Sequence, residues 1–147
     1  MNKAFRAVAG GVAGTAVLTL GLVVTDVETG YRIGIFETIA NFVGTPGQVT
    51  LGFALFVLAG VFAWPLVFVA VEGYLPGGPD PAVRAIPFAF VLWVAFVLTA
   101  PPGIDFPLII PYLALTLAAH LAYGYIVGAV YAQLDESEVE RDVGTSA

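Results

Sequence analysis

The chain has 147 residues, of which 59% are hydrophobic and only 11% are charged. An average soluble domain is about 45–50% apolar and about 25% charged, so this composition excludes disorder and disfavours an ordinary soluble domain. A net charge of −6 argues against nucleic-acid binding, because that function needs a basic surface. The chain has no cysteine, which excludes disulfides, thiolate metal sites and cysteine nucleophiles.

Four long uncharged runs lie between the charged residues. Each run comes close to or exceeds the roughly 20 apolar residues that a helix needs to cross a bilayer. Within hydrocarbon the backbone must satisfy its own hydrogen bonds, so each run is expected to be a helix. We therefore predict an all-α, polytopic membrane protein whose residues 1–134 form one four-helix transmembrane bundle. The predicted spans cover residues 7–25, 49–71, 85–104 and 106–134.

The basic residues near the ends of these spans predict an orientation. With the N-terminus inside, Lys3, Arg6, Arg84 and Arg141 lie on the inner side, and only Arg32 lies outside. Lys and Arg are enriched in cytoplasmic segments of membrane proteins. We therefore expect a multi-pass protein of the cell membrane with both termini in the cytoplasm.

The segments outside the spans also carry information. Residues 26–48 form a long outer connection whose apolar stripe, broken by Arg32, Glu37 and Asn41, predicts a short interfacial helix. Whether this segment lies on the membrane, re-enters it or covers a partner stays open. On the inner side, Glu72 and Arg84 are placed at about the same depth, where they can pair. The acidic tail, residues 135–147, is expected to be solvated and disordered.

Two pairs of glycines have the spacing of a helix-packing motif. Gly10 and Gly14 form a GxxxG pair in the first span, and Gly124 and Gly128 form a second in the fourth span. Small residues four positions apart let two membrane helices approach closely. We expect the first and fourth spans to pack on each other through these faces. The alternative is that one pair lies at a subunit interface.

The fourth span carries the only histidine, His120, near its middle. Ionisable residues in a span are expected to face the protein interior and to have a partner. Steps of four residues along a helix place this histidine on one polar, small-residue face, flanked by Tyr123. The other members of that face are Tyr112, Thr116, Gly124 and Gly128.

Two interpretations of His120 stay open. In the first it is structural and bonds to a backbone carbonyl or a threonine, because buried polar groups find partners. In the second it is functional, as a haem ligand, a quinone contact or a proton relay. The only methionine is Met1, so a single chain does not supply the His/His or His/Met pair that often ligates haem. We expect no cofactor and no metal site in this chain.

Enzyme chemistry finds little support in the sequence. The only serines, Ser137 and Ser146, lie in the tail, and no phosphate-binding or dinucleotide-binding glycine motif is present. A transport function is harder to exclude, although the spans contain no charged residue where carriers usually place one. Pro65 and Pro87 are expected to kink the second and third spans. Because the spans hold no serine and the chain has none of these glycine motifs, we expect a protein that is not an enzyme.

The order of these features resembles an uncharacterised family of small four-helix integral membrane proteins from haloarchaea. The resemblance implies a fold and a setting but no activity and no catalytic residues, and it covers nearly the whole chain except the tail. The segments that carry it are Ala9–Thr15, Ile33–Phe36, Tyr74–Pro81, His120–Gly124 and Gly128–Tyr131.

Two functions follow from this reading. The leading expectation is a non-catalytic accessory or structural subunit of a respiratory or transport complex, with the lipid bilayer and other membrane subunits or further copies as partners. The alternative is a small oligomeric channel or carrier whose path runs along Thr116, His120 and Tyr123. A subunit needs apolar small-residue surface for its partners, whereas a carrier needs a cavity that reaches His120.

Overall fold

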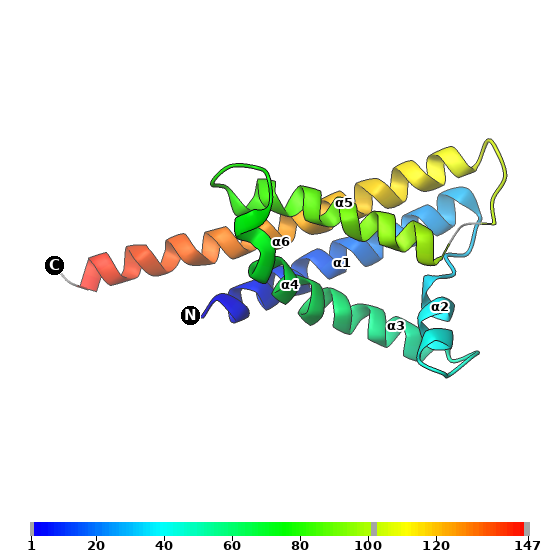
Figure 1. Ribbon diagram of the computed structural model, residues 1–147, viewed down its shortest axis with the longest axis horizontal. Coiled ribbons are helices and arrows are strands. Elements are labelled where there is room, and N and C mark those ends of the chain that lie inside the picture. The colour runs from blue at the N-terminus through cyan, green and yellow to red at the C-terminus, as the bar shows by residue number, and fades with distance from the viewer. Residues whose placement is uncertain (1, 101–102, 146–147) are drawn as a thin grey trace.

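The computed structural model describes residues 2–100 and 103–145, with side chains up to Glu136, and this part of the chain contains helices and no strands. Figure 1 shows long rods joined by short connections. The helices in chain order are α1 (Lys3–Thr29), α2 (Ile35–Phe42), α3 (Val49–Leu58), η1 (Ala59–Ala63), α4 (Trp64–Val71), η2 (Glu72–Tyr74), α5 (Pro81–Thr99) and α6 (Ile109–Thr145).

Four helical stretches are long and apolar enough to cross a membrane, in agreement with the number predicted from the sequence. They are Lys3–Thr29, Val49–Tyr74, Pro81–Thr99 and Ile109–Glu136. The third begins four residues before the predicted start, because the Asp80 side chain accepts a hydrogen bond from the Ala82 N–H at 2.8 Å. Pro81 then occupies the first helical turn, where its missing N–H costs nothing.

The last helix runs further than expected. We predicted disorder from Asp135 onward, but α6 continues without a break to Thr145. Its final residues include several glutamates, which are good helix formers, and the helix they extend is already nucleated. The side chain of Asp135, the first residue of the predicted tail, also pairs with Arg6 of α1. The boundary at Leu134 is therefore not a boundary of secondary structure.

The second stretch is not a regular α-helix. Between α3 and α4 the chain makes the π-helical turn η1, in which the Trp64 N–H donates to the Ala59 carbonyl five residues back. Pro65 follows directly and has no N–H to donate. The irregularity predicted at Pro65 therefore takes the form of a π-turn. As a result, the Gly60 carbonyl has neither the α-helical partner, Trp64, nor the π-helical partner, Pro65.

The helices pack in the order second stretch, α1, α6, α5. Helix α1 lies along α6, α5 lies on another side of α6, and η1 and α4 pack against α1. In Figure 1 the α3–α4 rod and α5 lie close together near the 75–80 connection and diverge toward the opposite end, where α2 lies against α3. The rings of Phe68 and Phe88 mark the close end, with centroids 5.7 Å apart.

The expected glycine contact between the first and fourth spans is half correct. A Cβ on Gly10 would lie 2.6 Å from the Val127 carbonyl oxygen, so the glycines of α1 do face α6. The glycines of α6, however, face α5: a Cβ on Gly124 would lie 2.5 Å from the Ala85 carbonyl oxygen, and one on Gly128 would overlap Pro81. One residue step turns a helix by about 100°, so Val127 and Gly128 point to different neighbours.

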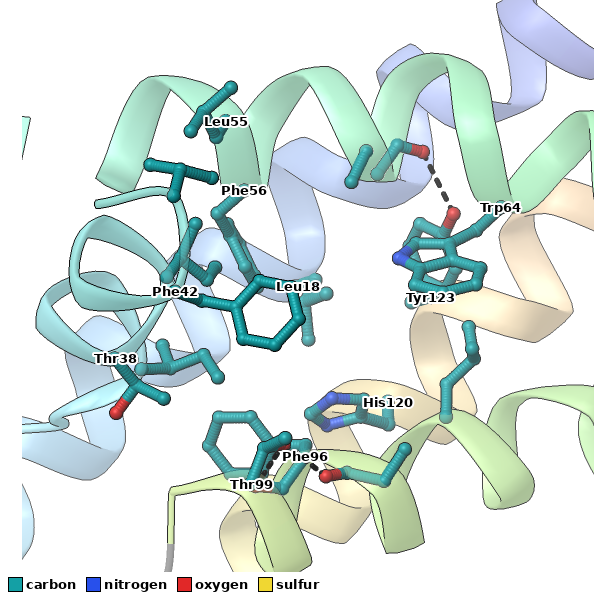
Figure 2. Close-up of a pocket in the computed structure, with 17 residues that line it drawn as sticks. Leu18, Thr38, Phe42, Leu55, Phe56, Trp64, Phe96, Thr99, His120 and Tyr123 are labelled. Carbon is teal, nitrogen blue, oxygen red and sulfur yellow. Dashed lines mark hydrogen bonds between the residues drawn. The ribbon is translucent and has the colours of Figure 1, made fainter. Parts of the chain in front are cut away.

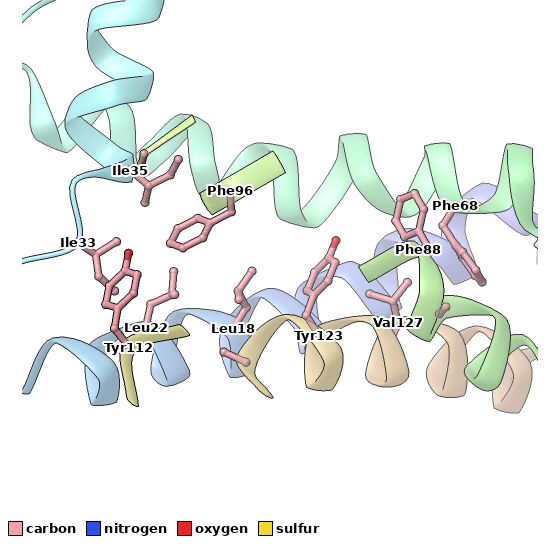
Figure 3. Packing of buried hydrophobic residues seen from close by; sticks show 13 residues of the cluster. Leu18, Leu22, Ile33, Ile35, Phe68, Phe88, Phe96, Tyr112, Tyr123 and Val127 are labelled. Atoms are coloured by element: carbon pink, nitrogen blue, oxygen red, sulfur yellow. The ribbon is translucent and has the colours of Figure 1, made fainter. Parts of the chain in front are cut away.

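A buried apolar cluster runs along the junction of α1, α5 and α6 (Figure 3). Close packing of this kind supplies most of the attraction between helices where water provides none. The loop before α2 adds Ile33 to the cluster, and α2 itself adds Ile35. Its larger members from the long helices are Leu18, Leu22, Phe68, Phe88, Phe96, Tyr112, Tyr123 and Val127.

Candidate functional site

The divergence of the α3–α4 rod from α5 leaves a cavity of about 510 Å³. Figure 2 shows side chains converging on it from both walls and from α2. The lining is almost entirely apolar, and its residues with polar side-chain groups are Thr38, Trp64, Thr99, His120 and Tyr123. Its main apolar contributors are Leu18, Ile35, Ile39, Phe42, Val43, Leu55, Phe56, Trp64, Leu92 and Phe96.

His120 lies on the floor of this cavity and is only 4% exposed. Its Nδ1 is 2.8 Å from the carbonyl oxygen of Thr116, one helical turn earlier. A carbonyl oxygen only accepts, so Nδ1 carries the proton and donates it. Nε2 of the neutral ring is then an acceptor, and no hydrogen bond from any described residue reaches it. The Phe96 ring packs against the imidazole, with centroids 4.9 Å apart.

Thr116 is buried but does not line the cavity. Its hydroxyl accepts a hydrogen bond from the Trp93 indole N–H at 3.1 Å and donates to the Tyr112 carbonyl at 2.8 Å. The hydroxyl therefore joins α5 to α6 and has both of these roles satisfied inside the bundle. Trp93, which the sequence places within a span, thus packs between helices through a specific polar contact.

Tyr123 also has a structural use for its hydroxyl. The Tyr123 hydroxyl donates to the Gly60 carbonyl at 2.8 Å, which is the carbonyl left without a helical partner by the π-turn and Pro65 (Figure 2). The bond crosses from α6 to the second stretch, while the face of the ring lines the cavity. Of the three side chains on the predicted path, only His120 and Tyr123 share the cavity, and only His120 has a polar atom left for a ligand.

A buried hydroxyl beside this bond was not singled out from the sequence. Thr15 of α1 is 3% exposed, and its Oγ1 has no hydrogen-bond partner among the described residues. A Cβ added to Gly60 would lie 2.5 Å from that oxygen, so α1 and η1 are in close contact here. Gly11, one turn earlier, is equally close to Pro65, where an added Cβ would lie 2.6 Å from the ring.

A polar cluster at the other end of the bundle was also missed. Arg6 is 4% exposed, pairs with Asp135, and lies with its guanidinium carbon 5.1 Å from the Tyr131 ring centroid. The Tyr131 hydroxyl donates to Glu72 at 3.3 Å. The suggested Glu72–Arg84 pair does not form, because Arg84 Nε donates instead to the Gly78 carbonyl at 2.5 Å. The signal was the placement of Arg6 and Asp135 at the same ends of neighbouring spans.

The site does not have the form of a metal centre. Within the described residues, no three His, Asp or Glu side chains come together in the way that metal ligands do. His120 has Phe96 and backbone around it rather than carboxylates. The arrangement is suited to holding an apolar molecule through one polar contact.

The molecule is therefore a helical protein with four helices of membrane-spanning length and an apolar cavity that contains one histidine. A protein-family model matches residues 1–141, and its description is a family of unknown function, DUF6789. The chain belongs to this family. No curated protein and no solved structure matches the chain.

Proposed function

We propose that the chain is a multi-pass protein of the cell membrane with both termini in the cytoplasm. The support is the outward-facing apolar surface: only 17% of the most apolar window in Val49–Tyr74 is buried inside the protein. The start of α1, which carries Lys3 and Arg6, and the start of α5, which carries Arg84, lie at one end of the bundle, and the connection from α1 to α2 lies at the other (Figure 1). The positive-inside rule favours the more basic end as the cytoplasmic one. The resemblance to haloarchaeal membrane proteins and the acidic balance of the chain agree with a salt-adapted source.

In this setting α2 lies in the outer interface. Figure 1 shows α2 running across the direction of the long helices rather than along it. Ile35 and Ala40 are buried, whereas Glu37 is exposed and Phe42 is 91% exposed. Exposed apolar and charged side chains on one short helix are what an interfacial helix presents to acyl chains and headgroups.

The absence of cysteine makes the orientation directly testable. Lys3→Cys and Glu37→Cys each introduce one exposed thiol, at opposite ends of the bundle. In intact cells, a membrane-impermeant maleimide should label the Glu37→Cys variant and should label Lys3→Cys only after lysis. The reverse pattern would invert the orientation, and labelling of both in sealed cells would contradict the membrane-spanning proposal.

Within the membrane we propose a non-catalytic role, as an accessory or structural subunit that assembles with other membrane helices. The observation that carries this proposal is a shallow hollow on the outer surface of α1 and α6. Small residues dominate its α6 side, and membrane helices associate through surfaces of this kind. The hollow is lined by Val17, Leu20, Gly21, Val24, Leu115, Ala118, Ala119 and Ala122.

Purification in mild detergent at high salt tests this role, with mass spectrometry of the co-purifying chains. A stoichiometric partner, such as a respiratory or transport subunit or a further copy, is the expected result. Ala118→Phe fills the hollow from an exposed position and should release that partner, whereas Ala54→Phe, an exposed alanine of α3, should not. A monomer without partners, or retention of the partner by Ala118→Phe, would overturn this use of the surface.

A small carrier is the second candidate, and the cavity that reaches His120 is the observation that favours it. Thr116 lies outside that cavity and the Tyr123 hydroxyl is bonded to Gly60, so the lining suits an apolar cargo rather than an ion. His120→Leu should abolish flux in proteoliposomes and leave assembly intact. Absence of flux in the unmodified chain, with a bundle destabilised by His120→Leu, would leave His120 with a structural role only.

A further inference from the structure

Among the polar side chains that line the cavity between the α3–α4 rod and α5, His120 is deeply buried and has an atom without a use in the fold. The Thr99 hydroxyl donates to the Ala95 carbonyl, and the Tyr123 hydroxyl donates to the Gly60 carbonyl. His120 is only 4% exposed, yet its Nε2 receives no hydrogen bond from the described residues. An acceptor that faces an apolar cavity without a partner is costly, so the cavity favours an occupant that pairs with it.

We infer that this cavity binds a neutral, membrane-soluble molecule that has an apolar body and a hydroxyl group, with the hydroxyl donating to His120 Nε2. The Nδ1–H of His120 is already directed at the Thr116 carbonyl, so Nε2 accepts and does not donate. A ligand hydroxyl satisfies that atom, whereas an ether or a ketone of the same shape does not. A volume of about 510 Å³ lies within the range of pockets that hold small molecules.

Two other occupants fit less well. A buried water needs two to four polar partners, and the Thr99 and Tyr123 hydroxyls of the lining already donate to backbone carbonyls. A phospholipid keeps its headgroup at the interface and would bring only methylene groups to this depth. His120 lies 11 residues into α6, roughly 16 Å along the helix at 1.5 Å per residue, which is near the middle of a 30 Å hydrocarbon layer.

The position of His120 near the middle of a bilayer depends on the proposed membrane setting, whereas its Nε2 lacks a partner among the described residues in any setting. The thiol-labelling experiment tests the setting without any ligand. If labelling supports the setting and the binding experiment fails, only the inference about the cavity is overturned.

The single histidine allows a direct measurement. The full chain, carrying ¹⁵N-labelled histidine in lipid nanodiscs, gives one pair of imidazole resonances. Farnesol is the probe, and farnesyl methyl ether is the control that keeps the apolar body and removes the donor. We expect farnesol to shift the Nε2 resonance and leave Nδ1 nearly unchanged. The ether should leave both in place and bind about tenfold more weakly, as the loss of one buried hydrogen bond requires.

Two variants keep the result interpretable. Ala95→Phe narrows the cavity from an exposed position on α5 and leaves His120 intact, so it should weaken farnesol binding about tenfold. Ala54→Phe adds the same bulk on α3 outside the cavity and should leave binding unchanged. Equal binding of farnesol and its ether, an unshifted Nε2 resonance, or insensitivity to Ala95→Phe would each overturn the assignment.

Discussion

The Tyr123 hydroxyl donates a hydrogen bond to the Gly60 carbonyl across the interface between α6 and the π-turn η1. That carbonyl is free because Trp64 donates one residue further back and Pro65 has no N–H. A helix irregularity in one segment is thus compensated by a side chain 63 residues away. In an apolar interior such compensation is required, because no water is present to satisfy the carbonyl.

Tyr123→Phe should therefore destabilise the fold. The change leaves the Gly60 carbonyl unpaired, and the expected loss is about 1–3 kcal/mol of unfolding free energy. Thermal unfolding in detergent measures it, with Tyr125→Phe as the control, since Tyr125 is 53% exposed. Combining Tyr123→Phe with Pro65→Ala, which restores a backbone N–H near Gly60, should cost less than the sum of the two single changes. Strict additivity would contradict this account of the bond.

Replacing each of two buried threonines by valine should change the free energy of unfolding in opposite directions. Thr15→Val removes a hydroxyl without a partner and keeps the shape of the side chain, so it should raise the unfolding free energy by about 1 kcal/mol. Thr116→Val removes the acceptor of the Trp93 indole N–H and should lower it by about 1–3 kcal/mol. Denaturation titrations of both variants test the pair. A loss of stability in Thr15→Val would show that its hydroxyl has a partner.

The contacts of the glycines predict which helix–helix interface an added methyl group disturbs. Gly124→Ala places a Cβ against Ala89 and the Ala85 carbonyl of α5 and should cost about 1–3 kcal/mol. Ala89→Gly in the same chain should restore part of the loss, because it removes one of the two contacts. Gly73→Ala meets nothing within 4 Å and is the control. If Ala89→Gly restored none of the lost stability, the finding that Gly124 faces α5 would be contradicted.

The Arg6–Asp135 pair should contribute measurably to the junction of α1 and α6. Asp135→Ala removes one partner of a buried guanidinium, while the carboxylate itself is largely exposed, so a loss of about 1 kcal/mol is expected. Glu136→Ala, the exposed neighbour, is the matched control. Unfolding measured at low and high salt should show the Asp135 effect shrinking as ionic strength rises. Equal stability of both variants at low salt would show that the pair contributes nothing.

The sequence by itself determined the helical class and the number of long apolar helices. Both depend on local properties: run length, apolar content and the need of the backbone to satisfy itself. The short helix after Ile33 follows from an equally local pattern. Even the irregularity at Pro65 was foreseeable, because proline removes a donor wherever it falls in a helix.

Only the tertiary structure decided which faces meet. The glycine spacing is the same in α1 and α6, yet one pair faces α6 and the other faces α5, because the rotation of each helix about its axis is set by all its neighbours at once. The same holds for His120, whose step-of-four relation to Thr116 placed them on one face but did not show that Thr116 is used by Trp93. Whether a polar group in a span is satisfied or left for a ligand depends on partners from distant segments, and here that selected the Nε2 atom of His120.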